Sequence, residues 1–221
     1  MLRRNSMRHL IKIFLTLVFT TLPAFSAIQG KLDYSIPIDY TKLSREELDT
    51  KAGFYYNLAI KNSQGKVNDE MTAALNLYKI LQNQNPENTF YNIRLGHLYD
   101  IIGQDKYAKG CFYQAIGCDD SQAEPYYRLG EFYYRRQFYK RALKFYKEAY
   151  KKGFSTHYET LYKLGDIYEK FGDTEAALKY LKLASEQSPN SELDSKIQRV
   201  EAANQANREY YSDTRIRLIE R

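Results

Sequence analysis

The sequence predicts an all-α protein, a solenoid of about four antiparallel helix pairs closed by a C-terminal capping helix. The main evidence is a set of positions that recurs about every 34 residues, as expected for a structural repeat. Within each copy the apolar residues have the three- and four-residue spacing of one buried helix face. The recurring positions are Leu129, Gly130, Tyr133, Ala142, Tyr146 and Ala149, preceded by Leu95, Gly96, Tyr99, Ala108, Phe112 and Ala115, and followed by Leu164, Gly165, Tyr168, Ala177, Leu181 and Ala184.

The glycine of each copy lies inside a predicted helix, where alanine would be more stable by roughly 1 kcal/mol. We therefore expect a close approach between the paired helices at Gly130 and Ala142, with packing that offsets the cost of the glycine. Turn signals separate the two helices of a pair. They are Gly103 with Asp105 and Gly172 with Asp173, whereas the third pair has Arg136 and Gln137 at this place.

The segments follow one another in a definite order. We assign residues 1–26 to a signal peptide, 27–43 to an extended segment, 44–190 to the solenoid with repeats at approximately 52–88, 89–122, 123–157 and 158–191, and 192–221 to a capping helix and tail. The capping helix is predicted from Leu193, Ile197 and Val200, which have helical spacing and can cover the last repeat.

The N-terminal end of the solenoid has a helix start signal. Ser44-Arg45-Glu46-Glu47 is a capping box, and the helix that it opens continues into the first repeat. This first copy is the least regular, with extra residues in the turn around 64–66. Its recognisable positions are Leu58, Ala59, Ala74, Tyr78 and Leu81, followed by Pro86.

The first residues have the pattern of an export signal. Four basic residues precede the apolar run 13–22, and small residues suit cleavage after Ser26 or Ala27. We expect an exported bacterial protein, periplasmic or secreted, with no membrane span once the signal is removed. The run is about half of the roughly 20 apolar residues that a span requires, so an uncleaved N-terminal anchor is the alternative.

The net charge of +6 depends mostly on this N-terminal segment. Without its four basic residues, 29 of the 33 Lys and Arg remain against 27 Asp and Glu, a net charge of +2. The charge balance therefore gives no support to nucleic-acid binding. The unusual feature is the aromatic content of 15%, with 22 Tyr and no Trp.

Cys111 and Cys118 are the two cysteines. On one helix their Cα atoms would be roughly 10 Å apart, which is too far for a disulfide. A disulfide requires the helix to end at Gly117, and two free thiols are the alternative. The cysteines and scattered histidines lack the spacing of a metal site, so we predict no metal and no cofactor.

The motif Leu-Gly-x-x-Tyr, followed by Ala-x-x-x-aromatic-x-x-Ala at this period, resembles the tetratricopeptide repeat family. The resemblance covers about residues 52 to 190. It implies a right-handed solenoid in which the first helix of each pair, helix A, lines a concave groove. In that family the groove binds partner proteins.

The groove would be lined by a stripe of each helix A with the spacing i, i+3, i+7, i+10. Read onto this chain, the stripe is Phe90, Ile93, His97 and Asp100, then Glu124, Tyr127, Glu131 and Tyr134, then Glu159, Tyr162, Asp166 and Glu169, with Arg94, Arg128, Arg135, Lys163 and Lys170 beside it. This aromatic and acidic surface suits a partner segment with basic or aromatic side chains. A solvated face with i, i+4 ion pairs is the alternative. The partner-binding residues that we predict are Ile93, His97, Asp100, Tyr127, Arg128, Glu131, Tyr134, Arg135, Tyr162, Asp166 and Glu169.

The sequence contains no catalytic motif, so an enzyme is not predicted. The prediction is a non-catalytic protein–protein interaction module, an exported adaptor or assembly factor that holds a partner segment in its groove. The alternative is a structural component of an envelope complex, with self-association through the C-terminal helix or a basic convex face; the oligomeric state is open. That face would comprise Lys140, Arg141, Lys144, Lys147, Lys151 and Lys152.

Overall fold

A computed structural model describes residues 40–62 and 65–219 of the chain. The chain divides into two compact units, Met1–Leu43 and Ser44–Arg221. In the first unit only Tyr40–Leu43 are described, and Tyr40–Lys42 form a 3-10 turn, η1. The predicted signal peptide, and residues 27–39 of the predicted extended segment, lie outside the described residues. Among the helices of the described residues, none is long and apolar enough to cross a membrane.

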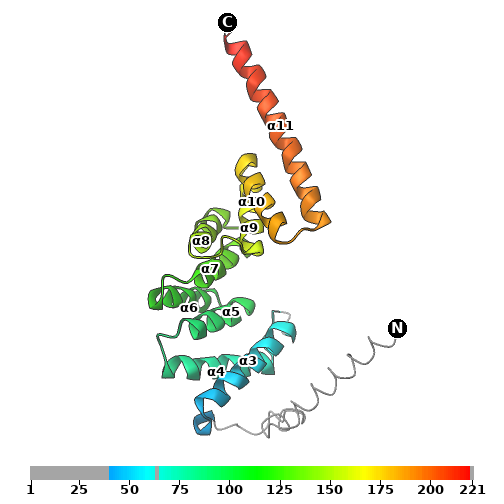
Figure 1. The fold of residues 1–221 in the computed structure, drawn as a ribbon. Coiled ribbons are helices and arrows are strands. Elements are labelled where there is room, and N and C mark those ends of the chain that lie inside the picture. The colour runs from blue at the N-terminus through cyan, green and yellow to red at the C-terminus, as the bar shows by residue number, and fades with distance from the viewer. Residues whose placement is uncertain (1–39, 63–64, 220–221) are drawn as a thin grey trace, which may run out of the picture. The chain divides into compact units, whose positions relative to one another are not determined.

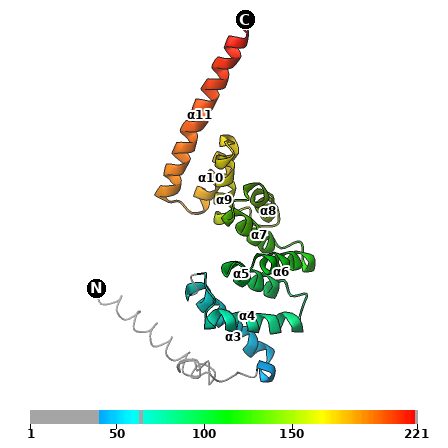
Figure 2. The same ribbon diagram turned by 180° about the vertical axis from the view of Figure 1, so that it is seen from behind.

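In the described part of the second unit, every regular element is an α-helix. Eight helices form four antiparallel pairs, and the ninth follows the last pair (Figures 1 and 2). The pairs are α3 (Arg45–Asn62) with α4 (Asp69–Gln84), α5 (Thr89–Ile101) with α6 (Asp105–Cys118), α7 (Ala123–Arg135) with α8 (Tyr139–Lys151), and α9 (Tyr158–Lys170) with α10 (Thr174–Gln187), followed by α11 (Ser191–Ile219). The predicted all-helical, paired fold with a C-terminal helix is confirmed.

The close approach predicted at the repeated glycines is present, and its cause is a ring or branched side chain from the second helix of the pair, which we call helix B. A Cβ on Gly130 would lie 2.7 Å from ring carbons of Tyr146, which is fully buried. The equivalent contact is 2.6 Å between Gly96 and Phe112. The glycine therefore makes room for the large side chain at the recurring helix B position, while Ala142 is buried in the same core.

The turn of the third pair has the same backbone conformation as the turns that contain glycine. Gly103 and Gly172 have φ angles of 73° and 77°, in the left-handed region. Gln137 has a φ of 61° and is the one non-glycine residue with positive φ among the described residues. The surrounding helix pair imposes this conformation on a residue that does not favour it.

The two ends of the array have the features that the sequence predicts, a capping box at the first helix and a helix packed on the last pair. At the start of α3 the Ser44 N–H donates to Glu47 Oε2 at 2.8 Å, and the Glu47 N–H donates to Ser44 Oγ at 3.3 Å, which is a capping box. At the other end, Leu193, Ile197 and Val200 of α11 are buried against the last pair. Beyond these residues α11 continues past α10, and its residues 201–210 are mostly exposed (Figure 1).

Both cysteines lie on α6, which continues through Gly117 to Cys118. The condition for a disulfide is therefore not met, and both thiols are free. Burial raises the pKa of Cys111 to about 11, so this thiol is protonated at neutral pH.

Candidate functional site

The predicted stripe lies on α5, α7 and α9, and we call it the A-helix face. Much of it is occupied by contacts between successive A helices. The Tyr56 hydroxyl of α3 lies 2.5 Å from His97 Nδ1 of α5, and the Tyr134 hydroxyl of α7 donates to Asp166 of α9 at 2.6 Å. Asp100 of α5 pairs with Arg135 of α7. Several residues predicted to bind a partner therefore bind a neighbouring repeat instead.

On α5, two of the predicted contact residues are inaccessible. Ile93 is only 2% exposed and belongs to the core, so its assignment to an open partner surface is wrong. Asp100 is 6% exposed and is held by Arg135 and by Arg136 Nη1 at 2.9 Å. Asp100 is covered because the next helix pair places Arg135 and Arg136 against it.

His97 is a neutral side chain in this environment. Burial is the largest cause that lowers its pKa, to about 3, and the positive charges of Arg128, Arg135 and Arg94 add to the effect. A histidine with this pKa is not protonated near pH 7. Its contact with Tyr56 indicates a structural role between repeats one and two.

On α7, the predicted contact residues are partly used for packing. The Tyr127 ring lies 6.0 Å from the Tyr146 ring and 5.0 Å from His157, measured between ring centroids. Glu131 accepts a hydrogen bond from the Tyr146 hydroxyl. Burial, with the nearby charge of Glu131, raises the pKa of both tyrosines, so they stay protonated hydrogen-bond donors.

On α9, the acidic residues are neutralised by the C-terminal helix. Lys196 of α11 lies 2.6 Å from Asp166 and 2.7 Å from Glu169, and Arg199 lies 3.1 Å from Glu169. Burial alone would raise the pKa of each carboxyl. The hydrogen bonds from Lys196 and the charges of the other cations outweigh burial, so both pKa values are lowered. Lys196 also lies over the Tyr162 ring at 5.3 Å. The predicted partner contacts on α9 are therefore occupied by α11.

The position of α11 follows from the period of the repeats. It begins at Ser191, 33 residues after the start of α9 at Tyr158. The first turns of α11 thus stand where helix A of a fifth repeat would stand. This continuation of the period was the sequence signal that could have identified Lys196 as an internal counter-ion.

The part of the A-helix face that stays available lies on α5 and α7, and it is aromatic and cationic. Phe90 is 46% exposed, and the Arg94 guanidinium stacks on it at 4.7 Å and on Tyr56 at 4.3 Å. Among the described residues no carboxylate lies within ion-pair distance of Arg94. Sequence reasoning placed Phe90 and Arg94 on or beside the stripe but did not select them as contact residues.

Arg128 has an unusual hydrogen-bonding state. Its Nη2 pairs with Glu124 of the same helix at 3.1 Å. Its Nε is buried and is the one buried side-chain nitrogen or oxygen without a hydrogen-bond partner in the described part of the chain. Buried polar atoms are normally satisfied, so an acceptor from water or from a bound molecule is expected there.

The basic residues predicted on α8 lie mostly at the surface, as expected. Lys151 pairs with Glu148 of its own helix at 2.9 Å, and Lys152 lies 3.9 Å from Asp120. A hydrogen bond with Tyr168 raises the pKa of Lys147. In the residues that the structure describes, no group of three or more His, Cys, Asp or Glu side chains could hold a metal ion.

Comparison with known proteins agrees with this geometry. Residues 121–190, which span α7 to α10, match the family model described as tetratricopeptide repeat. The chain has the tetratricopeptide repeat fold. No match to the sequence was found among curated proteins.

Several solved tetratricopeptide repeat structures resemble the chain. A crystal structure of MamA protein has a TM-score of 0.55 at 19% identity, covering 74% of this chain and 88% of MamA. MamA from Desulfovibrio magneticus RS-1 has a TM-score of 0.55 at 15% identity, covering 77% and 94%. YrrB, described as a TPR protein with an unusual peptide-binding site, has a TM-score of 0.53 at 20% identity, covering 72% and 81%. At these identities the similarity concerns the fold.

Proposed function

We propose that the chain is a non-catalytic protein–protein interaction module that binds a segment of a partner protein on the A-helix face of α5 and α7. The observation that carries the proposal is the unused hydrogen-bonding capacity of two guanidinium groups on this face. Arg94 has only aromatic contacts, and Arg128 has a buried Nε without an acceptor. Both can be completed by carboxylate or carbonyl oxygens of a bound polypeptide.

The chemistry of the partner follows from which charged and aromatic side chains of the A-helix face are left accessible by the contacts within the chain. Three carboxylates of the stripe, Asp100, Asp166 and Glu169, are paired within the chain, whereas Arg94 and Phe90 are accessible. The sequence alone favoured a partner with basic or aromatic residues. The paired carboxylates and available cations instead favour a segment with at least one carboxylate and an apolar or aromatic side chain, which the Phe90 ring can contact.

A peptide-binding role has support from the fold and from one relative. The fold is that of the tetratricopeptide repeat, and the structure of YrrB is described as having a peptide-binding site. We extend this role to the present chain as part of the proposal. In the finer assignment, export to a bacterial envelope rests on the N-terminal sequence pattern, and the role of adaptor or assembly factor rests on the resemblance to the tetratricopeptide repeat family.

A second candidate function is self-association. The observation that favours it is the exposed part of α11, which extends beyond the last helix pair (Figure 1). Residues 201–208 are held to α10 by polar contacts, which are Lys182 with Glu201, Thr174 with Asn204 and Arg208 with Glu175. A helix with so little apolar packing is marginally stable in water, so a partner helix would stabilise it. Light scattering on the chain with and without residues 201–221 separates the two functions, because only self-association predicts an oligomer that is lost on truncation.

The experiment that tests the main proposal is affinity capture from the source organism's extract. The bait is the chain from residue 27 onward, in its wild-type form and as Arg94→Ala with Arg128→Ala. A matched control is Lys61→Ala with Lys79→Ala, since both lysines are exposed on α3 and α4. A partner that is retained by the wild type and the control and lost by the arginine variant supports the proposal; equal retention by all three contradicts it.

A further inference from the structure

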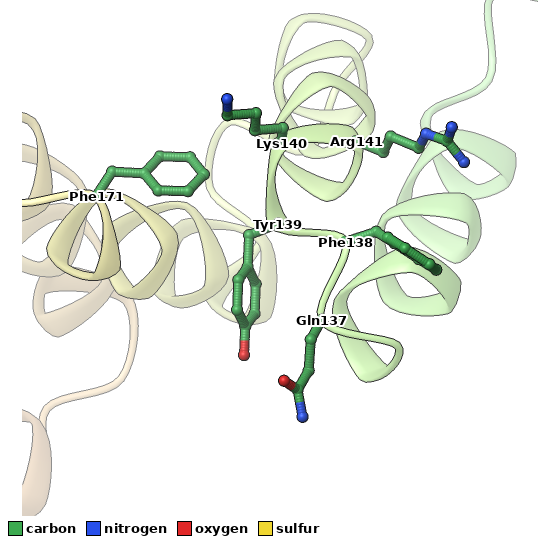
Figure 3. Close-up of a pocket in the computed structure, with 6 residues that line it drawn as sticks. All are labelled: Gln137, Phe138, Tyr139, Lys140, Arg141 and Phe171. Atoms are coloured by element: carbon green, nitrogen blue, oxygen red, sulfur yellow. The ribbon is translucent and has the colours of Figure 1, made fainter.

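A second surface feature lies away from the A-helix face, at the junction of the third and fourth helix pairs. It is a hollow of about 340 Å³ at the α7–α8 turn, the start of α8 and the end of α9 (Figure 3). The lining residues are Gln137, Phe138, Tyr139, Lys140, Arg141 and Phe171. None of them has a role in the binding site proposed above.

The hollow has exposed aromatic walls. Phe138 and Phe171 are 54% and 44% exposed, which places them among the most exposed large apolar side chains of the described residues. In Figure 3 the Phe171 ring points toward the start of α8, where Tyr139 and Lys140 lie. Phe138 leans to the other side together with Arg141, whose guanidinium lies 5.6 Å from its ring centroid. Exposure of two such rings beside one hollow leaves apolar area that a partner could cover.

The charge around the hollow is positive. The lining contains the cations Lys140 and Arg141 and no carboxylate. Helix α8 has no acidic residue in its first turn and no side-chain cap, so the positive end of the helix dipole adds to these charges. Lys170 lies 5.4 Å from the Tyr139 ring centroid, but its charge is shared with Asp166 at 3.6 Å, so Lys140 and Arg141 carry the positive charge of the hollow.

Three carboxylates on neighbouring helices and turns are already engaged. Asp105 pairs with Arg136, and Asp166 pairs with Lys196 and, at 3.6 Å, with Lys170. Asp173 caps α10 by accepting a hydrogen bond from the Ala176 N–H at 3.0 Å. Lys140 and Arg141 therefore keep their charge available to a molecule in the hollow.

We propose that this hollow is a second docking site, which binds a short acidic segment of a partner protein through one aromatic side chain and the carboxylates that flank it. The aromatic side chain packs beside Phe171 and Tyr139, and the carboxylates pair with Lys140 and Arg141. Aromatic anchors surrounded by complementary charge are the usual form of such contacts. The site is separate from the A-helix face, so the chain can hold two segments at once.

The test uses fluorescence anisotropy with a labelled peptide in which one phenylalanine has two aspartates on each side. Companion peptides replace the aspartates by lysine or the phenylalanine by alanine. We expect saturable binding of the first peptide alone, with weaker binding at higher ionic strength. Phe138→Ala with Phe171→Ala, and Lys140→Glu with Arg141→Glu, should each lower the affinity at least tenfold.

Two controls make the result specific. Lys61→Glu with Lys79→Glu changes the net charge equally on the first helix pair and should leave the affinity unchanged. The A-helix face is proposed to accept a similar peptide, so the hollow variants are also compared in the Arg94→Ala, Arg128→Ala background. In this background the peptide should still bind and should still depend on the hollow residues, which separates this site from the A-helix face. Because the four substituted residues at the hollow are largely at the surface, circular dichroism should show an intact fold in these variants.

The proposal is overturned if the acidic aromatic peptide does not bind at about 1 mM, or if the hollow variants bind it as the wild type does. Sedimentation with vesicles of phosphatidylcholine and phosphatidylserine provides the remaining comparison. Binding to these vesicles that depends on Phe138, Phe171, Lys140 and Arg141, in the absence of peptide binding, would assign the surface to an anionic membrane and overturn the proposal as well.

Discussion

Gly130→Ala offers the sharpest test of how the repeats pack. The added Cβ would lie 2.7 Å from two ring carbons of Tyr146, a distance that requires the ring to move. This ring is fully buried in a cluster with Leu129, Phe132 and Ala142, so it has little freedom to shift. Overpacking of this kind costs about 1–3 kcal/mol. The better helix propensity of alanine returns about 1 kcal/mol, so the variant should lose about 0–2 kcal/mol of folding stability.

The matched control is the same substitution at Gly110 in the middle of α6, where no atom of another element lies within 4 Å of an added Cβ. Gly110→Ala should gain roughly 1 kcal/mol from helix propensity alone. The difference between the two variants isolates the steric cost of about 1–3 kcal/mol. Urea denaturation followed by circular dichroism measures it, provided that each variant unfolds in one transition. Equal stabilisation by both substitutions would refute the packing of Gly130 against Tyr146.

Three further predictions concern the buried His97, the α11 interface and the strained turn. His97 has a pKa of about 3 in the folded chain, below its ordinary value of 6.5. Between these pH values the unfolded chain binds more protons than the folded chain, so the stability of the fold should decrease as pH falls from about 6.5 to 3. The loss can reach about 4 kcal/mol, and thermal melting of His97→Gln should show a smaller loss over this range. Lys196→Ala should destabilise the chain by about 2 kcal/mol because it leaves Asp166 and Glu169 with fewer cations; an unchanged melting temperature would argue against the α11 interface. Gln137→Gly should stabilise by up to about 1 kcal/mol, because glycine adopts the φ of 61° without strain, and a loss of stability would show that the Gln137 side chain has another role.

The sequence was sufficient to predict the helix pairs, because their determinants are local and repeated. Gly96 and Gly130 recur with the large helix B residues that they accommodate, and each contact involves residues of the same repeat. The capping box at Ser44 is also local. Such features can be identified from spacing along the chain.

The composition of the binding surface could not be predicted in the same way. Asp166 has one ion pair within its own helix, with Lys170, but the pairs that join Asp100 and Asp166 to neighbouring helices link residues 30 to 36 positions apart. Spacing rules for one helix identify partners three or four residues away, so they assigned these carboxylates to the surface. The sequence places the turn of the third pair at Arg136 and Gln137, but the positive φ of Gln137 could not be predicted, since the helix pair rather than the residue determines its backbone conformation.

The most direct test of the central proposal is the dissociation constant of a captured partner segment, measured by isothermal titration calorimetry against the wild type and against Arg94→Ala with Arg128→Ala. The unused hydrogen-bonding capacity of Arg94 and Arg128 predicts at least a tenfold weaker affinity for the double variant, with an unchanged melting curve. An unchanged dissociation constant in a folded double variant would contradict the account, because it would place the partner on another surface of the chain.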